Sequence, residues 1–134
     1  MKHAFVLLLA AGSFLISLSV VWAAGPALAP ATDLVATSAA DQVKLEWCKP
    51  KGVDGTLTYE VYRKSQAGVL VDTDILPANR VGIIGSDGGC LVYIDTAVRS
   101  GDTYSYAVIA VDATGTRSPI NPPSEGNSPV ATVP

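Results

Sequence analysis

One stretch organises the rest of the chain: residues 104–112, which read Tyr-Ser-Tyr-Ala-Val-Ile-Ala-Val-Asp. Successive side chains of an extended chain point to opposite faces, so Tyr104, Tyr106, Val108 and Ala110 share one face. Ser105, Ala107, Ile109 and Val111 share the other. Turn-forming residues flank the stretch at 99–103 and 113–116. This pattern predicts a β-strand whose tyrosine-bearing face is buried.

Shorter strand patterns recur along the chain and are separated by glycine, proline, asparagine and aspartate. They cover residues 31–36, 42–47, 58–64, 80–84, 90–95 and 128–133. Within them, Trp47, Tyr59 and Val61 fall on the inward side. With the stretch at 104–112 this makes seven short strands, and no helical periodicity follows residue 23. We therefore predict an all-β sandwich of two sheets.

The first 23 residues have the parts of a secretory signal peptide, and we expect them to form a hydrophobic signal helix. A weakly positive start, Lys2-His3, precedes an apolar run that ends in small residues. Val21 and Ala23 suit the small-residue positions of a signal peptidase site, so the mature chain is predicted to begin at Ala24. Residues 24–30 are expected to be a spacer and residues 31–134 a single domain.

A retained membrane anchor is the alternative for this segment, because residues 4–21 are uncharged over a length at the lower limit for spanning a bilayer. Gly12 and several serines dilute the run, which favours cleavage. The predicted location is secreted, extracellular or periplasmic, with membrane attachment only if residues 4–21 persist.

Charge and residue types exclude several functions. The chain has a formal net charge of −3, and removal of Lys2 with the signal peptide would leave an acidic surface that repels phosphate backbones, so nucleic acid is not an expected partner. Its only histidine is His3, so the mature chain has no base of the usual kind for a serine or cysteine nucleophile. We predict no enzymatic activity, no cofactor and no bound metal, while calcium at Asp72 and Asp74 stays open.

The two cysteines, Cys48 and Cys90, are an even pair in a chain that is expected to be exported, which favours a disulfide. Both fall on outward positions, because their strand neighbours Trp47 and Leu91 are expected to point inward. Free thiols or a metal site are the alternatives, but two cysteines without histidine make a poor zinc site.

The run from Val98 to Ser118 resembles the last third of a fibronectin type III module. The order of residues across the whole domain fits the same family: Trp47, Tyr59, Val61, Tyr93, Asp95, Gly101, Tyr104 and Asp112. A cadherin-like or other immunoglobulin-like sandwich is the competing fold. The resemblance implies that Trp47 anchors the core and that Tyr104 is a corner tyrosine bonded to upstream backbone. It also makes the two cysteine-bearing strands antiparallel neighbours.

The same resemblance places Tyr62 beside Ile109 and Val111 on the outward side of the central strands. An exposed apolar stripe there would be a candidate face for a protein partner or another copy of the chain. The alternative is that the proline-rich segment 119–126 covers it.

We therefore expect a secreted or envelope-associated module that acts by binding, adhesion or structural support, with an extracellular or envelope protein as its partner. A carbohydrate-binding accessory module is one alternative, although no exposed tryptophan is expected. A membrane-tethered subunit of an extracellular assembly is the other.

Overall fold

The computed structural model describes residues 27–120 and 129–134. The predicted signal peptide and the start of the spacer lie outside the described residues, so cleavage and tethering stay predictions. In the part of the chain that the structure describes, no helix is both long and apolar enough to cross a membrane.

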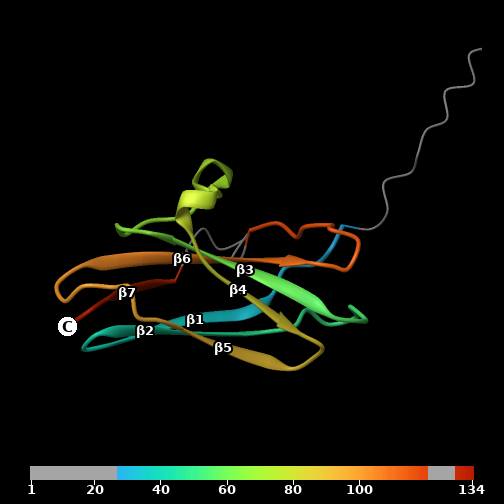
Figure 1. Ribbon diagram of the computed structural model, residues 1–134, viewed down its shortest axis with the longest axis horizontal. Coiled ribbons are helices and arrows are strands. Elements are labelled where there is room, and N and C mark those ends of the chain that lie inside the picture. The colour runs from blue at the N-terminus through green and yellow to red at the C-terminus, as the bar shows by residue number, and fades with distance from the viewer. Residues whose placement is uncertain (1–26, 121–128) are drawn as a thin grey trace, which may run out of the picture.

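Two antiparallel sheets form the molecule, and they contain all seven predicted strands (Figure 1). One sheet has the order β1 (Thr32–Ala39), β2 (Gln42–Cys48) and β5 (Cys90–Asp95). The other has the order β4 (Arg80–Ser86), β3 (Leu57–Lys64), β6 (Thr103–Val111) and β7 (Val130–Thr132). The prediction of an all-β, two-sheet sandwich is confirmed.

The last strand begins after Pro129, where the missing backbone donor does no harm. The Pro129 carbonyl accepts a hydrogen bond from the Tyr106 backbone amide at 3.0 Å. Residues 117 and 118 occupy the same edge of β6 further along, through a bridge between Val111 and Arg117. The edge of the central strand is thus paired at both of its ends.

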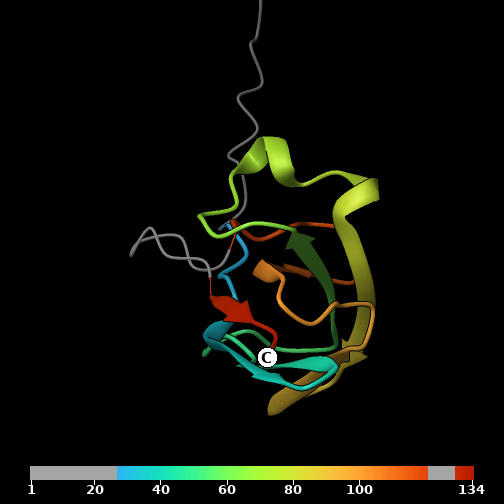
Figure 2. The same ribbon diagram turned by 90° about the vertical axis from the view of Figure 1, so that its left-hand side faces the viewer.

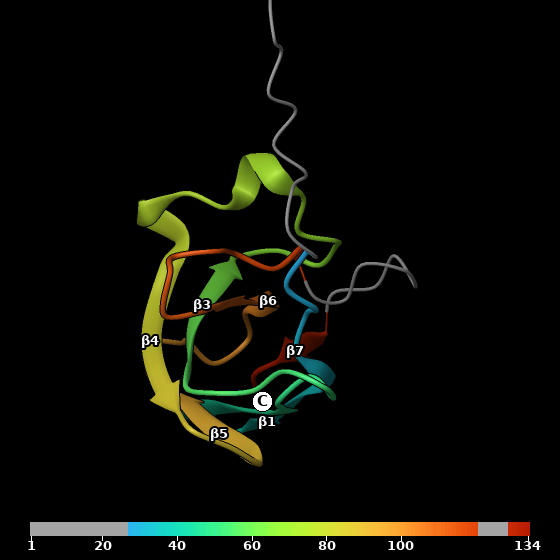
Figure 3. The same cartoon turned by 90° about the vertical axis from the view of Figure 1, so that its right-hand side faces the viewer.

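The core lies between the sheets, where alternate residues of both layers meet (Figure 3). Every predicted core anchor is buried there: Trp47, Tyr59, Val61, Tyr104, Tyr106 and Val108. The Trp47 and Tyr59 rings meet edge to face, with centroids 5.6 Å apart. Leu28 also belongs to this core, so packing begins before the predicted domain start at residue 31.

A second apolar cluster covers the outer face of the four-stranded sheet. Tyr62, Ala107 and Ile109 lie on that face as their parity predicts, but Leu70 packs on them and Ile75 and Ile120 close the edges. The covering loop carries two short 3₁₀ turns, η1 (Asp72–Asp74) and η2 (Pro77–Asn79), which stand above the sheet in Figures 1 and 2.

This cover corrects the expectation of an exposed partner face at Tyr62, Ile109 and Val111. Tyr62 and Ile109 keep only 3% and 4% of their surface exposed. Among the described residues, Leu70 and Ile75 of the loop between β3 and β4 and Ile120 form this cover, while residues 121–126 of the proline-rich segment lie outside the described residues. The chain therefore covers these apolar side chains itself, without a partner protein.

Cys48 and Cys90 form a disulfide, as predicted. They are direct cross-strand partners at the end of β2 and the start of β5. The sequence separation is 42 residues, so the bond closes a long loop that includes β3 and β4 of the other sheet.

Candidate functional site

A hollow of about 430 Å³ opens on the outer side of the four-stranded sheet. Two connections that exceed what a minimal sandwich needs form its walls: the loop between β3 and β4, and residues 117–120 after β6. Loops carried on a rigid sheet are common positions for binding residues. This hollow is therefore the candidate site.

Its floor is apolar and belongs to the sheet and the second cluster. Tyr62 and Ile109 contribute from β3 and β6, and Ile75, Ile120 and Pro119 contribute from the two walls. Pockets that bind small molecules combine such a floor with a few polar groups that fix orientation. In this hollow those polar groups are charged.

Glu60 is the centre of the charged groups beside the hollow. It lies on β3 two residues before Tyr62, so both side chains project from the outer face. The Arg117 guanidinium donates to both of its carboxylate oxygens, at 3.0 and 2.7 Å. The Tyr62 hydroxyl donates to the same carboxylate and accepts a hydrogen bond from Arg117 at 3.1 Å. A two-point arginine contact of this kind is both strong and directional.

These contacts control the protonation of Glu60. Burial by itself would raise the pKa of the Glu60 carboxyl, but the hydrogen bonds from Tyr62 and Arg117 outweigh it and lower that pKa below its ordinary value. Burial and the neighbouring carboxylate raise the pKa of the Tyr62 hydroxyl. Glu60 is thus ionised, and Tyr62 neutral, at physiological pH.

Arg80 and Asp72 stand at the rim of the hollow. Arg80 approaches Glu60 only to 3.8 Å, and that carboxylate is already paired with Arg117. Among the described residues, neither the Arg80 guanidinium nor the Asp72 carboxylate makes a side-chain hydrogen bond. The rim therefore offers unused donors from one residue and unused acceptors from the other.

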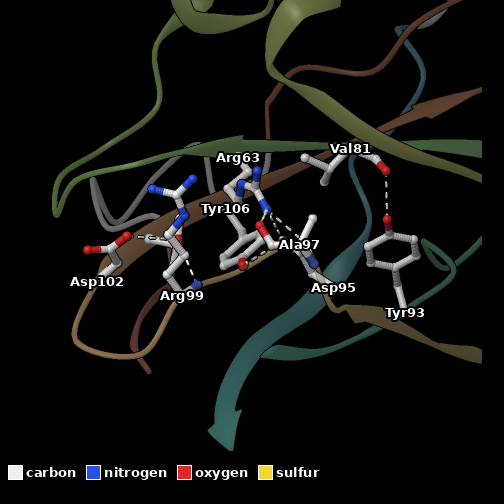
Figure 4. A network of polar contacts seen from close by, with 9 residues as sticks. Arg63, Val81, Tyr93, Asp95, Ala97, Arg99, Asp102 and Tyr106 are labelled. Carbon is white, nitrogen blue, oxygen red and sulfur yellow. Dashed lines mark hydrogen bonds and ion pairs between the residues drawn. The ribbon is translucent and has the colours of Figure 1, made fainter. Parts of the chain in front are cut away.

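A second polar network lies inside the sandwich (Figure 4). The Asp95 carboxylate, only 2% exposed, ends β5 and faces the other sheet. It accepts hydrogen bonds from Arg63 on β3 at 2.8 Å and from the Tyr106 hydroxyl on β6 at 2.9 Å. Arg63 also donates to the carbonyl of Ala97 at 2.7 Å. The network joins the two sheets, so its role is structural.

Arg63 lies on β3 and points into this network instead of into solvent. The side chain is only 19% exposed because it reaches back to Asp95, and its guanidinium carbon lies 5.1 Å from the centre of the Tyr104 ring. Burial, followed by the hydrogen bond to Asp95, raises the pKa of the Tyr106 hydroxyl. Sequence reasoning missed the pair because its members are 32 residues apart.

Tyr104 occupies the corner position that the resemblance implied. Its hydroxyl accepts a hydrogen bond from the Arg99 backbone amide at 3.0 Å and donates to Asp102 at 3.2 Å. The turn before β6 is thereby fixed against the strand, as expected for a corner tyrosine.

Asp72 and Asp74, the residues considered for calcium, lie in η1 and do different things. Asp74 pairs with Lys64 at 3.2 Å and accepts a hydrogen bond from the Val71 amide at 2.9 Å. These contacts, the amide bond first, lower the pKa of the Asp74 carboxyl. Within residues 27–120 and 129–134, no group of three or more His, Cys, Asp or Glu side chains is placed to hold a metal ion.

No protein-family model matches the sequence. Over 92 residues, or 69% of its length, the chain is 35% identical to the amylopullulanase of Thermoanaerobacter thermohydrosulfuricus. That match spans only 5% of the amylopullulanase, so the similar region is a small segment of a much larger enzyme.

Three solved structures resemble the fold more distantly. A β-1,2-glucanase from Parabacteroides distasonis matches with a TM-score of 0.49 and 20% identity over 81% of this chain and 14% of that one. A family 76 glycoside hydrolase from a bovine Bacteroides thetaiotaomicron strain gives 0.47 and 16% over 69% and 19%. The fn3 domain of human collagen alpha-1(XX) chain gives 0.46 and 14% over 83% and 90%. At TM-scores under 0.5, these likenesses carry no inference about function.

Proposed function

We propose that this chain is an exported, non-catalytic accessory module, similar to fibronectin type III, that attaches to glucans. The observation that carries the proposal is the 35% identity to a segment that makes up only 5% of an amylopullulanase. A segment so small in an enzyme of that size is suited to an accessory role. The name of that enzyme, amylopullulanase, refers to starch and to pullulan, so amylose and pullulan are the glucans to test.

The geometry favours binding over turnover. Glycoside hydrolysis needs one carboxylic acid that stays protonated to serve as general acid. Arg117 and Tyr62 hold Glu60 ionised beside the hollow, which is the opposite arrangement. Asp95 is enclosed between the sheets by Arg63 and Tyr106.

Export is supported by the Cys48–Cys90 disulfide, because such bonds form and persist in oxidising compartments. The predicted signal peptide at residues 1–23 agrees with this location. Together they support action outside the cytoplasm.

Binding to polymer tests the proposal. The purified protein is mixed with insoluble amylose and sedimented, and is run through native gels with and without pullulan. We expect retention by at least one polymer, none by cellulose, and no release of reducing ends. Failure to be retained by amylose or pullulan would contradict glucan attachment, and new reducing ends would contradict the non-catalytic role.

Protein attachment is the second candidate, and the outer face of the three-stranded sheet favours it. Val35, Val92 and Ile94 on that face are 51%, 50% and 40% exposed. They surround the Lys44–Glu46 ion pair. Across a two-fold axis, Lys44 of one copy would pair with Glu46 of the other copy. Sedimentation equilibrium checks this candidate, which predicts a dimer that a Val92→Lys substitution dissociates.

A further inference from the structure

We propose that the hollow between η1 and residues 117–120 binds one neutral sugar unit of a glucan chain, held between Arg80 and Asp72 against the partly exposed side chains of Ile75 and Ile120. This inference rests on the proposed function and locates the glucan-binding site in the hollow.

The charged groups in and beside the hollow cancel one another. Arg117 neutralises Glu60 by a two-point contact, and Arg80 and Asp72 add one positive and one negative charge at the rim. The four groups together have no net charge. A phosphate or carboxylate ligand would therefore gain from Arg80 but meet Asp72 as a like charge. A neutral ligand avoids this conflict.

The hydrogen-bonding capacity of Arg80 and Asp72 also favours a sugar as the ligand. Each sugar hydroxyl both donates and accepts, whereas a guanidinium only donates and a carboxylate only accepts. Arg80 and Asp72 have these capacities unused within the described residues, and both face the same hollow. A polyhydroxyl ligand is the class that satisfies both groups at once, through charge-assisted hydrogen bonds.

The shape of the hollow also suits a sugar. A pyranose ring has C–H groups that pack on apolar surfaces, and the accessible apolar lining is provided by Ile75, Pro119 and Ile120. The volume of about 430 Å³ lies in the range of natural small-molecule sites. The second apolar cluster holds this floor rigid, so little ordering is required when a ligand binds.

The test compares rim variants with a matched control in binding to a short soluble amylose fragment by calorimetry. Arg80→Ala and Asp72→Ala each remove one unused rim group, and we expect about tenfold weaker binding from each, the usual effect of one charge-assisted hydrogen bond. Lys44→Ala removes an exposed, ion-paired cation from the opposite sheet, and we expect affinity close to that of the wild type. Circular dichroism confirms that all four proteins are folded.

Each outcome is decisive. If both rim variants bind the fragment as tightly as the wild type does, the hollow is not the site, although glucan attachment stands. If Lys44→Ala weakens binding as much as Arg80→Ala, the site lies elsewhere. If the wild-type protein binds neither the fragment nor the polymers, both proposals fall. Raising the salt concentration should leave the affinity unchanged, and a steep loss would contradict a neutral ligand.

Discussion

At the residue scale, Asp95 shows how a carboxylate is kept inside this sandwich. Its two oxygens accept hydrogen bonds from Arg63, Tyr106 and the backbone amide of Ala97. A buried charge is tolerated only when it is paired and its lone pairs are satisfied, and this arrangement does both. The pair ties β5 of one sheet to β3 and β6 of the other.

Asp95→Asn is expected to destabilise the protein by about 3 kcal/mol, because it leaves the partly buried Arg63 without its counter-charge. Urea denaturation measures the loss. Glu46→Gln is the matched control, since it breaks the exposed Lys44–Glu46 pair and should cost less than about 1 kcal/mol. Equal effects of the two substitutions would show that the Asp95 network does not tie the sheets together.

Glu60 gives a pH dependence of known sign. Its folded-state pKa is lowered, so the folded protein binds this proton less readily than the unfolded chain does. The stability that Glu60 provides is therefore present above its unfolded pKa of about 4.3 and is lost as the pH falls through the folded value.

Glu60→Gln is accordingly expected to destabilise the protein at neutral pH and to matter progressively less below pH of about 4. Urea denaturation of both proteins across this range measures the difference in unfolding free energy. A difference that stays constant with pH would mean that the Arg117 contact does not depend on the charge of Glu60.

At the element scale, β4 and β5 are edge strands of different sheets that meet through Gly82 and Tyr93. The Tyr93 hydroxyl donates to the carbonyl of Val81 at 2.7 Å (Figure 4). A Cβ atom at residue 82 would lie 2.5 Å from the Tyr93 ring. Only glycine permits this close approach of ring and backbone.

Gly82→Ala should therefore push the ring from β4 and cost about 1 to 3 kcal/mol of stability, as overpacked sites do. Thermal unfolding gives the measurement. Gly85→Ala on the same strand is the control, because a Cβ there meets no atom within 4 Å, and its effect should be small. If both variants melt at the same temperature, the contact between β4 and Tyr93 is not tight in solution.

The disulfide fixes the same edge strand, β5, to its neighbour β2. It joins β2 to β5 across 42 residues, for which a chain-entropy treatment gives about 4 kcal/mol. The double substitution of Cys48 and Cys90 by serine should lower the unfolding free energy by about that amount, as measured with urea. Alkylation without reductant, followed by mass spectrometry, should label no thiol in the wild-type protein.

At the scale of the whole molecule, the period of two along the strands was enough to predict the sheets. The pattern of residues 104–112 predicts correctly which side chains of β6 share a face, and Trp47 and Tyr59 follow from the same parity, but the second face of β6 is buried as well. The local pattern determines the faces of a strand because successive side chains point to opposite sides of the sheet, whatever packs on them. The disulfide was predictable for a related reason, since both cysteines are outward on strands that the resemblance makes neighbours.

The candidate site was not predictable in this way. Glu60 and Arg117 are 57 residues apart, and no periodic pattern links a strand residue to one in a later loop. The cover formed by Leu70 and Ile75 comes from a loop whose path has no sequence signature. The sequence contains one indication of the site. Glu60 lies on the same outward face of its strand as Tyr62, and a carboxylate among apolar neighbours needs a cationic partner.

The claim that this sandwich holds a sugar on the outer face of its four-stranded sheet is tested most directly by a crystal structure of the protein with a short amylose fragment. The account predicts two sheets of the described order with one sugar ring between Arg80 and Asp72, its C–H face against Ile75 and Ile120. An ordered sugar bound at another surface, with this hollow empty, would contradict it.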